Sequence, residues 1–292
     1  MTNFLNLTSD YNSEDGSYFK ILPIPYEGTV CFEHGTAQGP ERICAVSDQM
    51  EYIDEETFCE FWRDGVHTLP SIEPQKTPSE EMAAIERTVR ENHLFDGHHF
   101  PIALGGEHSI TSPIVKVAAE NYPNLSVLQF DAHSDLRDTF EPGGKFSHAS
   151  VMRRVLEITP NLVQVGIRSF SEQDLIEIPQ RVEKFVPPKV LESNLSAAVE
   201  LICKRLTETV YITFDMDAFD PSVAPGVGTP EPGGLSWRQV TTILAAVFAE
   251  KNVIGADVVE TMPLGGNNVV TEFLAARLVG KIMTAKFLNR GR

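Results

Sequence analysis

Two short strings of carboxylates and histidine stand out in the sequence as groups that could do chemistry. They read DAHSD at residues 131–135 and DMD at residues 215–217. Each follows an apolar run that is typical of a buried strand. Because side chains two positions apart in an extended chain point to the same side, the polar residues of each string should converge. The residues expected to meet are Asp131, His133, Asp135, Asp215 and Asp217.

Four carboxylates in one small space repel each other and lose hydration, and bound cations remove that cost. Oxygen ligands combined with imidazole suit a pair of divalent metal ions, with manganese favoured and iron, cobalt or nickel as alternatives. Two such ions lower the pKa of water and support hydrolysis. The two strings therefore predict a binuclear metal hydrolase.

Apolar runs and helical periodicity alternate along the whole chain. Strands are predicted at residues 19–24, 100–104, 126–130, 162–167, 210–214 and 253–259. Helices are predicted from near Pro40 and at residues 79–92, 109–121, 194–206, 236–249 and 269–288. Ser236 and Gln239 have the spacing of a capping box at the start of one of these helices. This alternation predicts an α/β fold with a parallel central sheet and helices on both faces.

Ligands in such folds bind at the carboxyl ends of the strands. His108, residues 131–135, residues 215–217 and Glu260 all follow predicted strands, so four strand ends should face one crevice. We expect residues 1–292 to form a single domain, with residues 1–17 as a flexible or draped N-terminal arm.

Composition limits the class of partner. The chain has 292 residues, 42% of them hydrophobic, and a net charge of −17. This charge argues against nucleic acid or an anionic membrane surface as a partner, and it is compatible with a cationic substrate. Four scattered cysteines predict free thiols, and neither a signal peptide nor a membrane-spanning run is visible, so we expect a cytoplasmic protein.

Three motifs together resemble the metal-binding motifs of the ureohydrolase family, which includes arginase and agmatinase. They are GGEH at residues 105–108, DAHSD at 131–135 and DMDAFDP at 215–221. Residues 215–234 are similar to the longest signature of that family, with Thr213 where serine is more common. The resemblance implies a three-layer α/β/α sandwich, two Mn²⁺ ions, hydrolysis of a guanidinium group to urea and an amine, and a trimer or hexamer.

The resemblance also implies roles for individual residues. One metal would be held by His108, Asp131, Asp135 and Asp215 with Asp217 or its neighbours, and the other by His133, Asp131, Asp215 and Asp217, with the division of the bridging carboxylates left open. Glu260 would orient the positive guanidinium, and Asp135 would donate the proton that the leaving amine needs. His148 matches the histidine that carries protons to and from the site, a task that suits the titration range of imidazole.

Each of these residues also has a plainer interpretation. A single aspartate after a strand is more often a helix cap or a surface charge, and Glu260 or His148 alone would be read as solvated. It is the combination of motifs that makes coincidence improbable. The remaining histidines, which we interpret as structural or exposed, are His34, His67, His93, His98 and His99. Cys31 lies in a loop expected to approach the site, with a packing role favoured.

The loops favour agmatine as the substrate, with putrescine and urea as products of a step in polyamine biosynthesis. The loop at residues 139–148 lacks the Asn-bearing motif with which arginases bind an α-amino acid, and residues 23–40 resemble the first loop of agmatinases. An acidic rim at Glu33 and Glu141 would favour the second cationic end of agmatine.

Alternatives remain within and outside this class. A guanidinobutyrase, or another ω-guanidino acid hydrolase, would use Lys145 or Arg137 to bind a carboxylate, and an arginase is less expected. A non-catalytic polyamine-binding homologue would have lost a metal ligand, and none is missing. A two-metal phosphoesterase is disfavoured because basic residues are scarce near the motifs.

Overall fold

The structure is a computed structural model that describes residues 2–177 and 185–290. Its centre is an eight-stranded sheet in the order β2-β1-β3-β8-β7-β4-β5-β6, and every neighbouring pair is parallel. The strands are β1 (Phe19–Ile24), β2 (Val66–Thr68), β3 (Phe100–Gly105), β4 (Ser126–Phe130), β5 (Leu162–Val165), β6 (Phe185–Val186), β7 (Thr209–Asp215) and β8 (Asn252–Val259). The predicted parallel sheet is confirmed.

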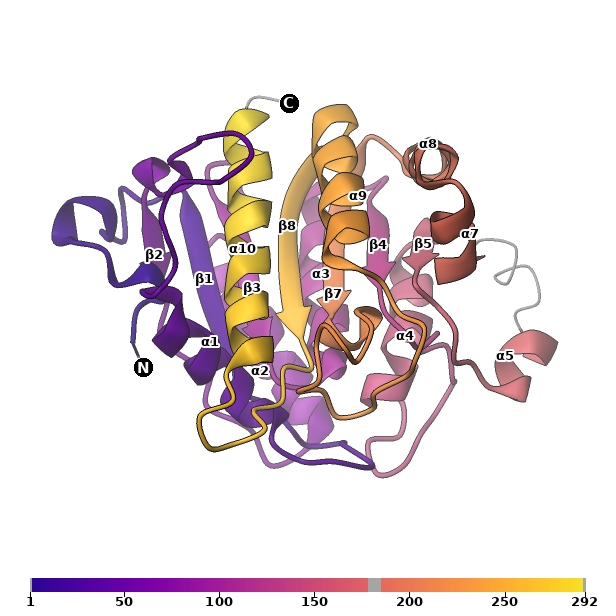
Figure 1. Ribbon diagram of the computed structural model, residues 1–292. Helices are drawn as coiled ribbons and strands as arrows, with labels where there is room; N and C mark the ends of the chain where they lie inside the picture. Colours follow the sequence, from indigo (N-terminus) through magenta and orange to yellow (C-terminus); the bar gives the residue numbers. More distant parts are fainter. Residues whose placement is uncertain (1, 178–184, 291–292) are drawn as a thin grey trace.

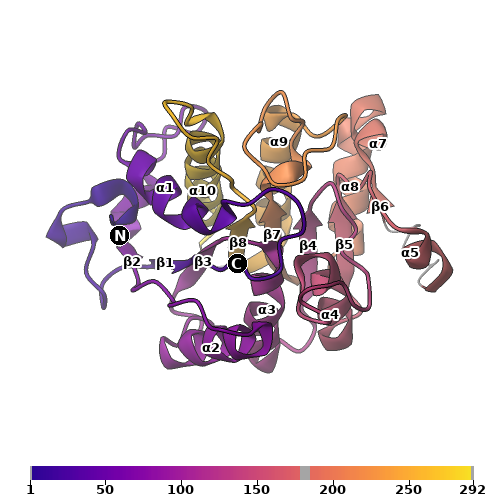
Figure 2. The same cartoon turned by 90° about the horizontal axis from the view of Figure 1, so that it is seen from below.

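Helices cover both faces of this sheet and complete three layers (Figures 1 and 2). One face carries α1 (Gly39–Ser47), α8 (Leu195–Arg205), α9 (Trp237–Glu250) and α10 (Val270–Leu288). The other carries α2 (Pro78–Glu91), α3 (Thr111–Asn121) and α4 (Val151–Ile158). The short helices α5 (Glu172–Glu177) and α7 (Pro188–Ser193) lie toward the β6 end. The expected α/β/α sandwich is therefore confirmed.

The central strands are buried on both faces, which explains why they read as continuous apolar runs. All residues of β3 and β4 are buried, as are all but the first residue of β7 and β8. A separate hydrophobic cluster fills the space on each face of the sheet. At the start of α9 the Ser236 side chain accepts from the backbone of Gln239, and the Gln239 side chain accepts in return, so the predicted capping box is confirmed.

Some elements were missed by the sequence interpretation. They are β2, β6, α4, α5 and α7. The strands β2 and β6 have three and two residues, which is too short for a periodic signal. In the segment expected to be an N-terminal arm, Phe4 and Leu5 are fully buried. They belong to the same hydrophobic cluster as apolar residues of α1 and α10.

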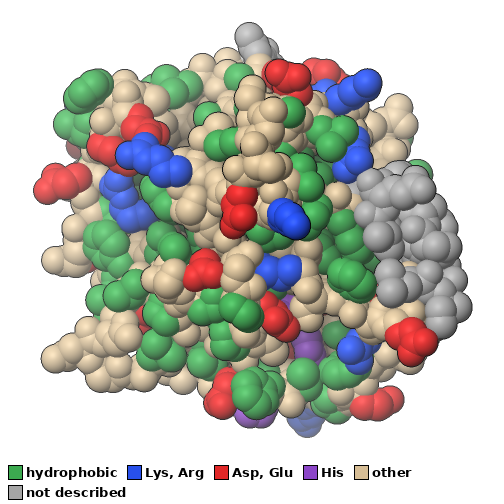
Figure 3. Space-filling model, turned by 45° about the vertical axis from the view of Figure 1, so that its right-hand side comes forward, with side chains coloured by type: hydrophobic (Ala, Val, Ile, Leu, Met, Phe, Trp, Pro, Cys, Tyr) green, Lys and Arg blue, Asp and Glu red, His purple; other side chains and the backbone are tan. Residues whose placement is uncertain are grey.

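Charged side chains are interspersed on the face shown in Figure 3, where lysines and arginines stand among acidic and apolar neighbours. Within residues 2–177 and 185–290, no helix has the length and apolar character needed to cross a membrane.

Four central strands position the predicted motifs. In the sheet order, β3, β8, β7 and β4 are consecutive neighbours, although β3 and β8 are far apart in the chain. Their carboxyl ends therefore lie side by side at one edge, next to the point where the strand order reverses. Such an edge is where parallel α/β folds bind ligands.

Candidate metal centre and active site

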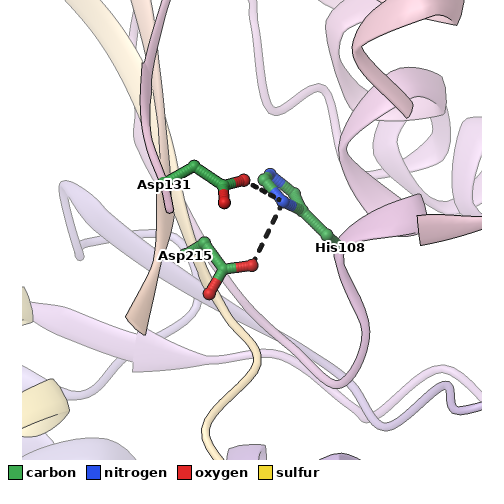
Figure 4. A group of neighbouring side chains, drawn as sticks. All are labelled: His108, Asp131 and Asp215. Atoms are coloured by element: carbon green, nitrogen blue, oxygen red, sulfur yellow. Dashed lines mark ion pairs between the residues drawn. The ribbon is translucent and has the colours of Figure 1, made fainter. Parts of the chain in front are cut away.

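Each predicted ligand sits at or just beyond the carboxyl end of one of the four strands. His108 begins a single 3-10 turn three residues after β3, Asp131 directly follows β4, and Asp215 is the last residue of β7. Figure 4 shows the carboxylates of Asp131 and Asp215 extending from neighbouring strands toward the imidazole of His108, which approaches from the opposite side. The fold thus brings together residues more than 100 positions apart.

The inner half of the centre consists of His108, Asp135 and Asp215. The Nδ1 atom of His108 lies 3.1 Å from Asp131 Oδ2, 3.2 Å from Asp135 Oδ2 and 3.3 Å from Asp215 Oδ2. The His108 side chain is only 1% exposed. One buried imidazole nitrogen therefore faces three carboxylates.

His108 is held on two further sides. Its backbone N–H donates to Glu260 Oε1 at 2.7 Å, and its Nε2 lies 2.8 Å from Thr213 Oγ1. Glu260 directly follows β8 and has a positive φ of 61°, a conformation uncommon for a residue other than glycine. The backbone at the end of β8 thus bends so that the Glu260 carboxylate meets the turn carrying His108.

The outer half of the centre consists of His133 and Asp217. The Nδ1 atom of His133 lies 2.9 Å from Asp217 Oδ2 and 3.6 Å from Asp131 Oδ1. Its side chain is 26% exposed, and its Nε2 is 3.9 Å from the carboxylate of Glu231. The histidine of this half is therefore more exposed than that of the inner half, although both halves line the same cavity.

Asp131 is shared by the two halves, and backbone donors orient it and its neighbours. Its Oδ1 accepts from the backbone N–H of His133 at 2.5 Å, and its Oδ2 accepts from Gln129 Nε2 at 2.7 Å. Asp217 Oδ1 accepts from the backbone N–H of Ala132 at 3.0 Å, which joins the ends of β4 and β7. These bonds fix the carboxylates before any cation binds.

The donors fit a pair of divalent cations. His108, Asp131 and Asp215 form one group with ligand atoms close enough for a metal ion, and Asp131, His133 and Asp217 form the other. The buried Nδ1 of His108 makes no hydrogen bond with any described residue, although three carboxylates surround it. Nitrogen and carboxylate oxygen in this proportion suit first-row divalent metals.

The pKa values of the acidic groups agree with this interpretation. Burial and the nearby Asp131 raise the pKa of Asp135 to about 6. Burial and the charges of Asp217 and Asp131 raise the pKa of Asp215 well above its usual value. Burial and the neighbouring Glu107 raise the pKa of Glu260 as well. Crowded acids of this kind ionise readily only when positive charge is placed among them.

Two partly exposed charged groups hold the long loop that follows β7. The guanidinium of Arg168 donates to the backbone oxygens of Asp217 at 2.8 Å and Glu231 at 2.8 Å. Asp220 accepts from the backbone N–H groups of Ser222, Gly233 and Gly234. These hydrogen bonds hold the loop against the centre and fix the backbone that carries Asp217.

His148 meets the first loop at the mouth of the site. Thr29 Oγ1 donates to Glu107 Oε1 at 2.6 Å, accepts from the backbone N–H of His148 at 3.2 Å and lies 3.3 Å from its Nδ1. Burial lowers the pKa of His148 to about 4, and burial raises that of Glu107 to about 7. Cys31 Sγ is 3.5 Å from His148 Nε2.

A cavity of about 280 Å³ opens from this centre. Aromatic side chains of Phe32, Phe140 and Phe170 line it together with the ligand residues. Outside the metal cluster and Glu260, its charged lining groups among the described residues are Glu33, Arg137 and Asp174. An apolar wall with a few charges is typical of a site for an extended small molecule.

The structure places every predicted site residue at this cavity or beside it. The predicted metal ligands are His108, Asp131, His133, Asp135, Asp215 and Asp217, and they converge as expected. Glu260 and His148 line the cavity, as do Glu33 and Arg137, whereas Glu141 and Lys145 are outside its lining.

The interpretation of Cys31 as a packing residue was wrong, because this residue is exposed and lines the cavity. All four cysteines are free, as expected. Of the other histidines, His34 is 70% exposed and pairs with Glu27, in line with the prediction.

Sequence reasoning missed several residues that support the site. They are Thr29, Glu107, Arg168, Asp174 and Asp257. Two of them gave a usable signal: Glu107 belongs to the GGEH motif, and Asp257 is a single carboxylate within the apolar strand β8. Its partners lie on β7 and α3 and are remote in the chain, so the signal could not reveal what it contacts.

Comparisons with known proteins agree with this arrangement. The model of the arginase family matches residues 17–285. The N(1)-aminopropylagmatine ureohydrolase of Synechocystis sp. is 39% identical over 90% of this chain and 87% of its own length. The agmatinase of Bacillus cereus is 33% identical over 90% of both chains. The solved agmatine ureohydrolase of Thermoplasma volcanium has a TM-score of 0.85 at 28% identity, covering 98% of this chain and 94% of that one.

Proposed function

This chain belongs to the arginase family and is a ureohydrolase, and we propose that it hydrolyses an agmatine-type amine. The products would be urea and a polyamine: putrescine from agmatine, or its aminopropyl derivative from N(1)-aminopropylagmatine. The observation that carries the proposal is the pair of candidate metal groups that share Asp131 at the end of β4. The higher identity to the aminopropylagmatine ureohydrolase favours the longer amine as the better substrate.

The residues of the inner half would hold one metal ion and those of the outer half the other, and Asp131 would contribute to both sites. When bound, a pair of divalent cations such as Mn²⁺ supplies Lewis-acid activation of water, since a guanidinium is resonance-stabilised and a poor electrophile. Carboxylate crowding and the unpartnered Nδ1 of His108 support this assignment. The choice of manganese rests on the donor types and on the resemblance to the ureohydrolase family.

We assign substrate orientation to Glu260. Its carboxylate lines the cavity beside the inner half, and the bond from the backbone of His108 fixes one of its oxygens. A guanidinium donates two parallel N–H groups to a carboxylate with good geometry. Glu260 would therefore hold the substrate so that the guanidinium carbon lies beside the two metal groups.

Proton transfer falls to Asp135 and His148 in this proposal. The leaving amine must gain a proton, and Asp135 lines the cavity beside the candidate metal groups, where its carboxyl group can pass one on. His148 lines the same cavity, and because burial lowers its pKa to about 4, its ring is neutral at pH 7 and readily releases to solvent any proton that reaches it. Thr29 would hold its ring through the contact with Nδ1.

Charges beyond the metal groups support an amine rather than an acid at the far end of the substrate. Asp174 is 3% exposed, and its Oδ2 accepts from Ser134 Oγ at 2.7 Å and from the backbone N–H of Ser171 at 2.9 Å. Its Oδ1 has no partner among the described residues, so this carboxylate is available to a cation. Glu33 adds a second negative charge to the cavity.

One observation favours a second candidate. Arg137 also lines the cavity, with its guanidinium 4.5 Å from the centre of the Phe140 ring. A cation there could bind the carboxylate of an ω-guanidino acid such as 4-guanidinobutyrate. The two candidates differ in the charge they require at the substrate's far end.

Urea release distinguishes them. The Mn²⁺-loaded chain would be offered agmatine, N(1)-aminopropylagmatine, 4-guanidinobutyrate and arginine at matched concentrations. We expect turnover of one or both amines and at most slow turnover of the acids. Preference for 4-guanidinobutyrate would transfer the assignment to the second candidate. The absence of urea from all four substrates, with two metals bound, would contradict the proposal.

A further inference from the structure

A buried carboxylate behind the metal centre has no role in the proposed reaction. Asp257 lies within β8, is 0% exposed and does not line the cavity. Three hydroxyl groups donate to it: Tyr211 at 2.9 Å, Thr111 at 3.0 Å and Thr213 at 2.7 Å. When ionised, Asp257 only accepts hydrogen bonds, so Thr213, which is nearest to it, directs its single hydrogen toward it. Thr111 Oγ1 also lies 3.2 Å from Thr213 Oγ1 and can donate to either acceptor.

Thr213 connects this carboxylate to the inner half. Its hydroxyl hydrogen is committed to Asp257, and its oxygen lies 2.8 Å from Nε2 of His108. A hydroxyl that has given away its only hydrogen can form this contact only as an acceptor. The hydrogen between the two residues must therefore belong to Nε2 of His108.

This assignment determines the state of the other ring nitrogen. A neutral imidazole with its hydrogen on Nε2 carries its lone pair on Nδ1. Nδ1 is the atom that faces the carboxylates of Asp131, Asp135 and Asp215 and makes no hydrogen bond with a described residue. The lone pair thus points to the place where a metal ion would be bound.

We propose that Thr213, oriented by Asp257, is the positioning residue that presents Nδ1 of His108 to a divalent cation. The inference rests on the ligand role proposed for His108. Partners of this kind, when removed from other metal sites, typically lower metal affinity by about 10- to 100-fold.

The outer half provides an internal contrast. Nε2 of His133 is 3.9 Å from Glu231, beyond hydrogen-bonding distance, and the side chain is partly exposed. No described hydroxyl holds His133 as Thr213 holds His108. A change at Thr213 should therefore weaken one metal site and leave the other unchanged.

The test is a Mn²⁺ titration of the metal-free chain, following free Mn²⁺ by electron paramagnetic resonance and heat by calorimetry. Thr213→Val removes the hydroxyl at nearly constant volume, and Thr213→Ser keeps it. Tyr211→Phe is the matched structural control, because it removes another donor from the same carboxylate without touching His108. Circular dichroism and thermal unfolding verify that each variant is folded.

We expect the wild-type chain, Thr213→Ser and Tyr211→Phe to bind two ions with similar affinities. Thr213→Val should bind one ion normally and the other about 10- to 100-fold more weakly. The inference is overturned if Thr213→Val binds both ions as the wild type does, or if Thr213→Val and Tyr211→Phe weaken both sites alike. If Thr213→Val does not fold, Thr213→Ala and Asp257→Asn are titrated instead and must show the same one-site loss.

The proposed function can fail separately. A wild-type chain that binds two ions but releases no urea would contradict the substrate proposal and leave the role of Thr213 open to the same titration. A wild-type chain that binds fewer than two ions would overturn both.

Discussion

The two halves of the metal centre use the same kinds of ligand in different surroundings. His108 is 1% exposed and is held at both its backbone and its Nε2 by Glu260 and Thr213. His133 is 26% exposed and has Glu231 at 3.9 Å from its Nε2. The histidine of the inner half is therefore held in place by its neighbours, and the histidine of the outer half is accessible to solvent.

This difference suggests a division of labour. A buried ligand with fixed neighbours keeps a cation in place and contributes to the packing of the sheet edge, at a cost in desolvation that only a cation offsets. A ligand open to the cavity leaves room for a substrate to approach. Changes in either half should thus weaken metal binding, but only changes in the inner half should also lower the stability of the metal-free chain.

The largest effect is expected for the residue common to both halves. Asp131→Asn should weaken both metal sites and lower urea release by about 10³-fold or more, since it removes several kcal/mol of metal-dependent stabilisation. Metal content per chain and the initial rate of urea formation measure this. The exposed Asp15 provides the control Asp15→Asn, which should change neither. Loss of only one ion would show that the halves do not share this carboxylate.

Replacing one histidine at a time tests the contrast itself. His108→Asn and His133→Asn should each remove one ion, but only His108→Asn should destabilise the metal-free chain, by about 2 kcal/mol, because it leaves buried polar groups without partners. For His133→Asn we expect a change within about 0.5 kcal/mol. Denaturant unfolding in the presence of a chelator gives both values. Equal losses would remove the distinction between inner and outer halves.

A change at Glu260, which lies beside the inner half, distinguishes substrate binding from metal binding. Glu260→Gln keeps an oxygen that can accept from His108 and removes the negative charge. We expect two ions still to bind, with kcat/KM for the amine lowered about 10- to 100-fold, the value of a hydrogen bond to a charged group. Steady-state kinetics and metal titration are compared on the same preparation. A parallel loss of metal would assign Glu260 to the ligand set.

A change at Asp174 tests whether the open side of the cavity binds the far end of the substrate. Asp174→Asn should raise KM for an agmatine-type amine by less than about 10-fold and leave kcat nearly unchanged, because an exposed or flexible ammonium gains little from one charge. The neighbouring exposed Glu172 supplies the control Glu172→Gln. An unchanged KM for Asp174→Asn would exclude this carboxylate from substrate recognition.

The smallest effect concerns the pH dependence of stability. Because burial lowers the pKa of His148 to about 4, its unfolded form, with a pKa near 6.5, binds a proton at a pH where the folded form does not. This group's contribution to stability is complete above about pH 6.5 and is lost as the pH falls toward 4. Between pH 7 and pH 5.5 the wild type should lose about 1 kcal/mol more than His148→Asn. Unfolding curves at both pH values give the difference, and parallel losses would contradict the assigned pKa.

The ligands were predictable because each motif is local. Asp131 directly follows β4 and Asp215 ends β7, so their meeting at the strand ends could be predicted. The alternation of an extended chain does not explain Asp217, which lies in the 3-10 turn Met216–Ala218, or Asp135, whose φ is 53°. The burial of whole strands made the sheet visible as apolar runs. The positions of helices were predictable for the same reason, as their periodicity is carried within each segment.

The surroundings of the ligands were not predictable, because they depend on contacts between distant segments. Thr213 and Asp257 are 44 residues apart, and Thr29 and Glu107 are 78 apart. No local pattern states that Cys31 faces His148, and the interpretation of Cys31 was wrong for this reason. The unequal exposure of His108 and His133 likewise follows from how the loops pack and not from the motifs that contain them.

The most direct test of the account is a Mn²⁺ titration of the metal-free wild-type chain, in which bound ions and urea released from N(1)-aminopropylagmatine and agmatine are followed in the same samples. We predict that two ions bind per chain and that urea release reaches its maximum only when the second site is filled. Full activity with one bound ion, or two bound ions without urea from either amine, would contradict a binuclear ureohydrolase of agmatine-type amines.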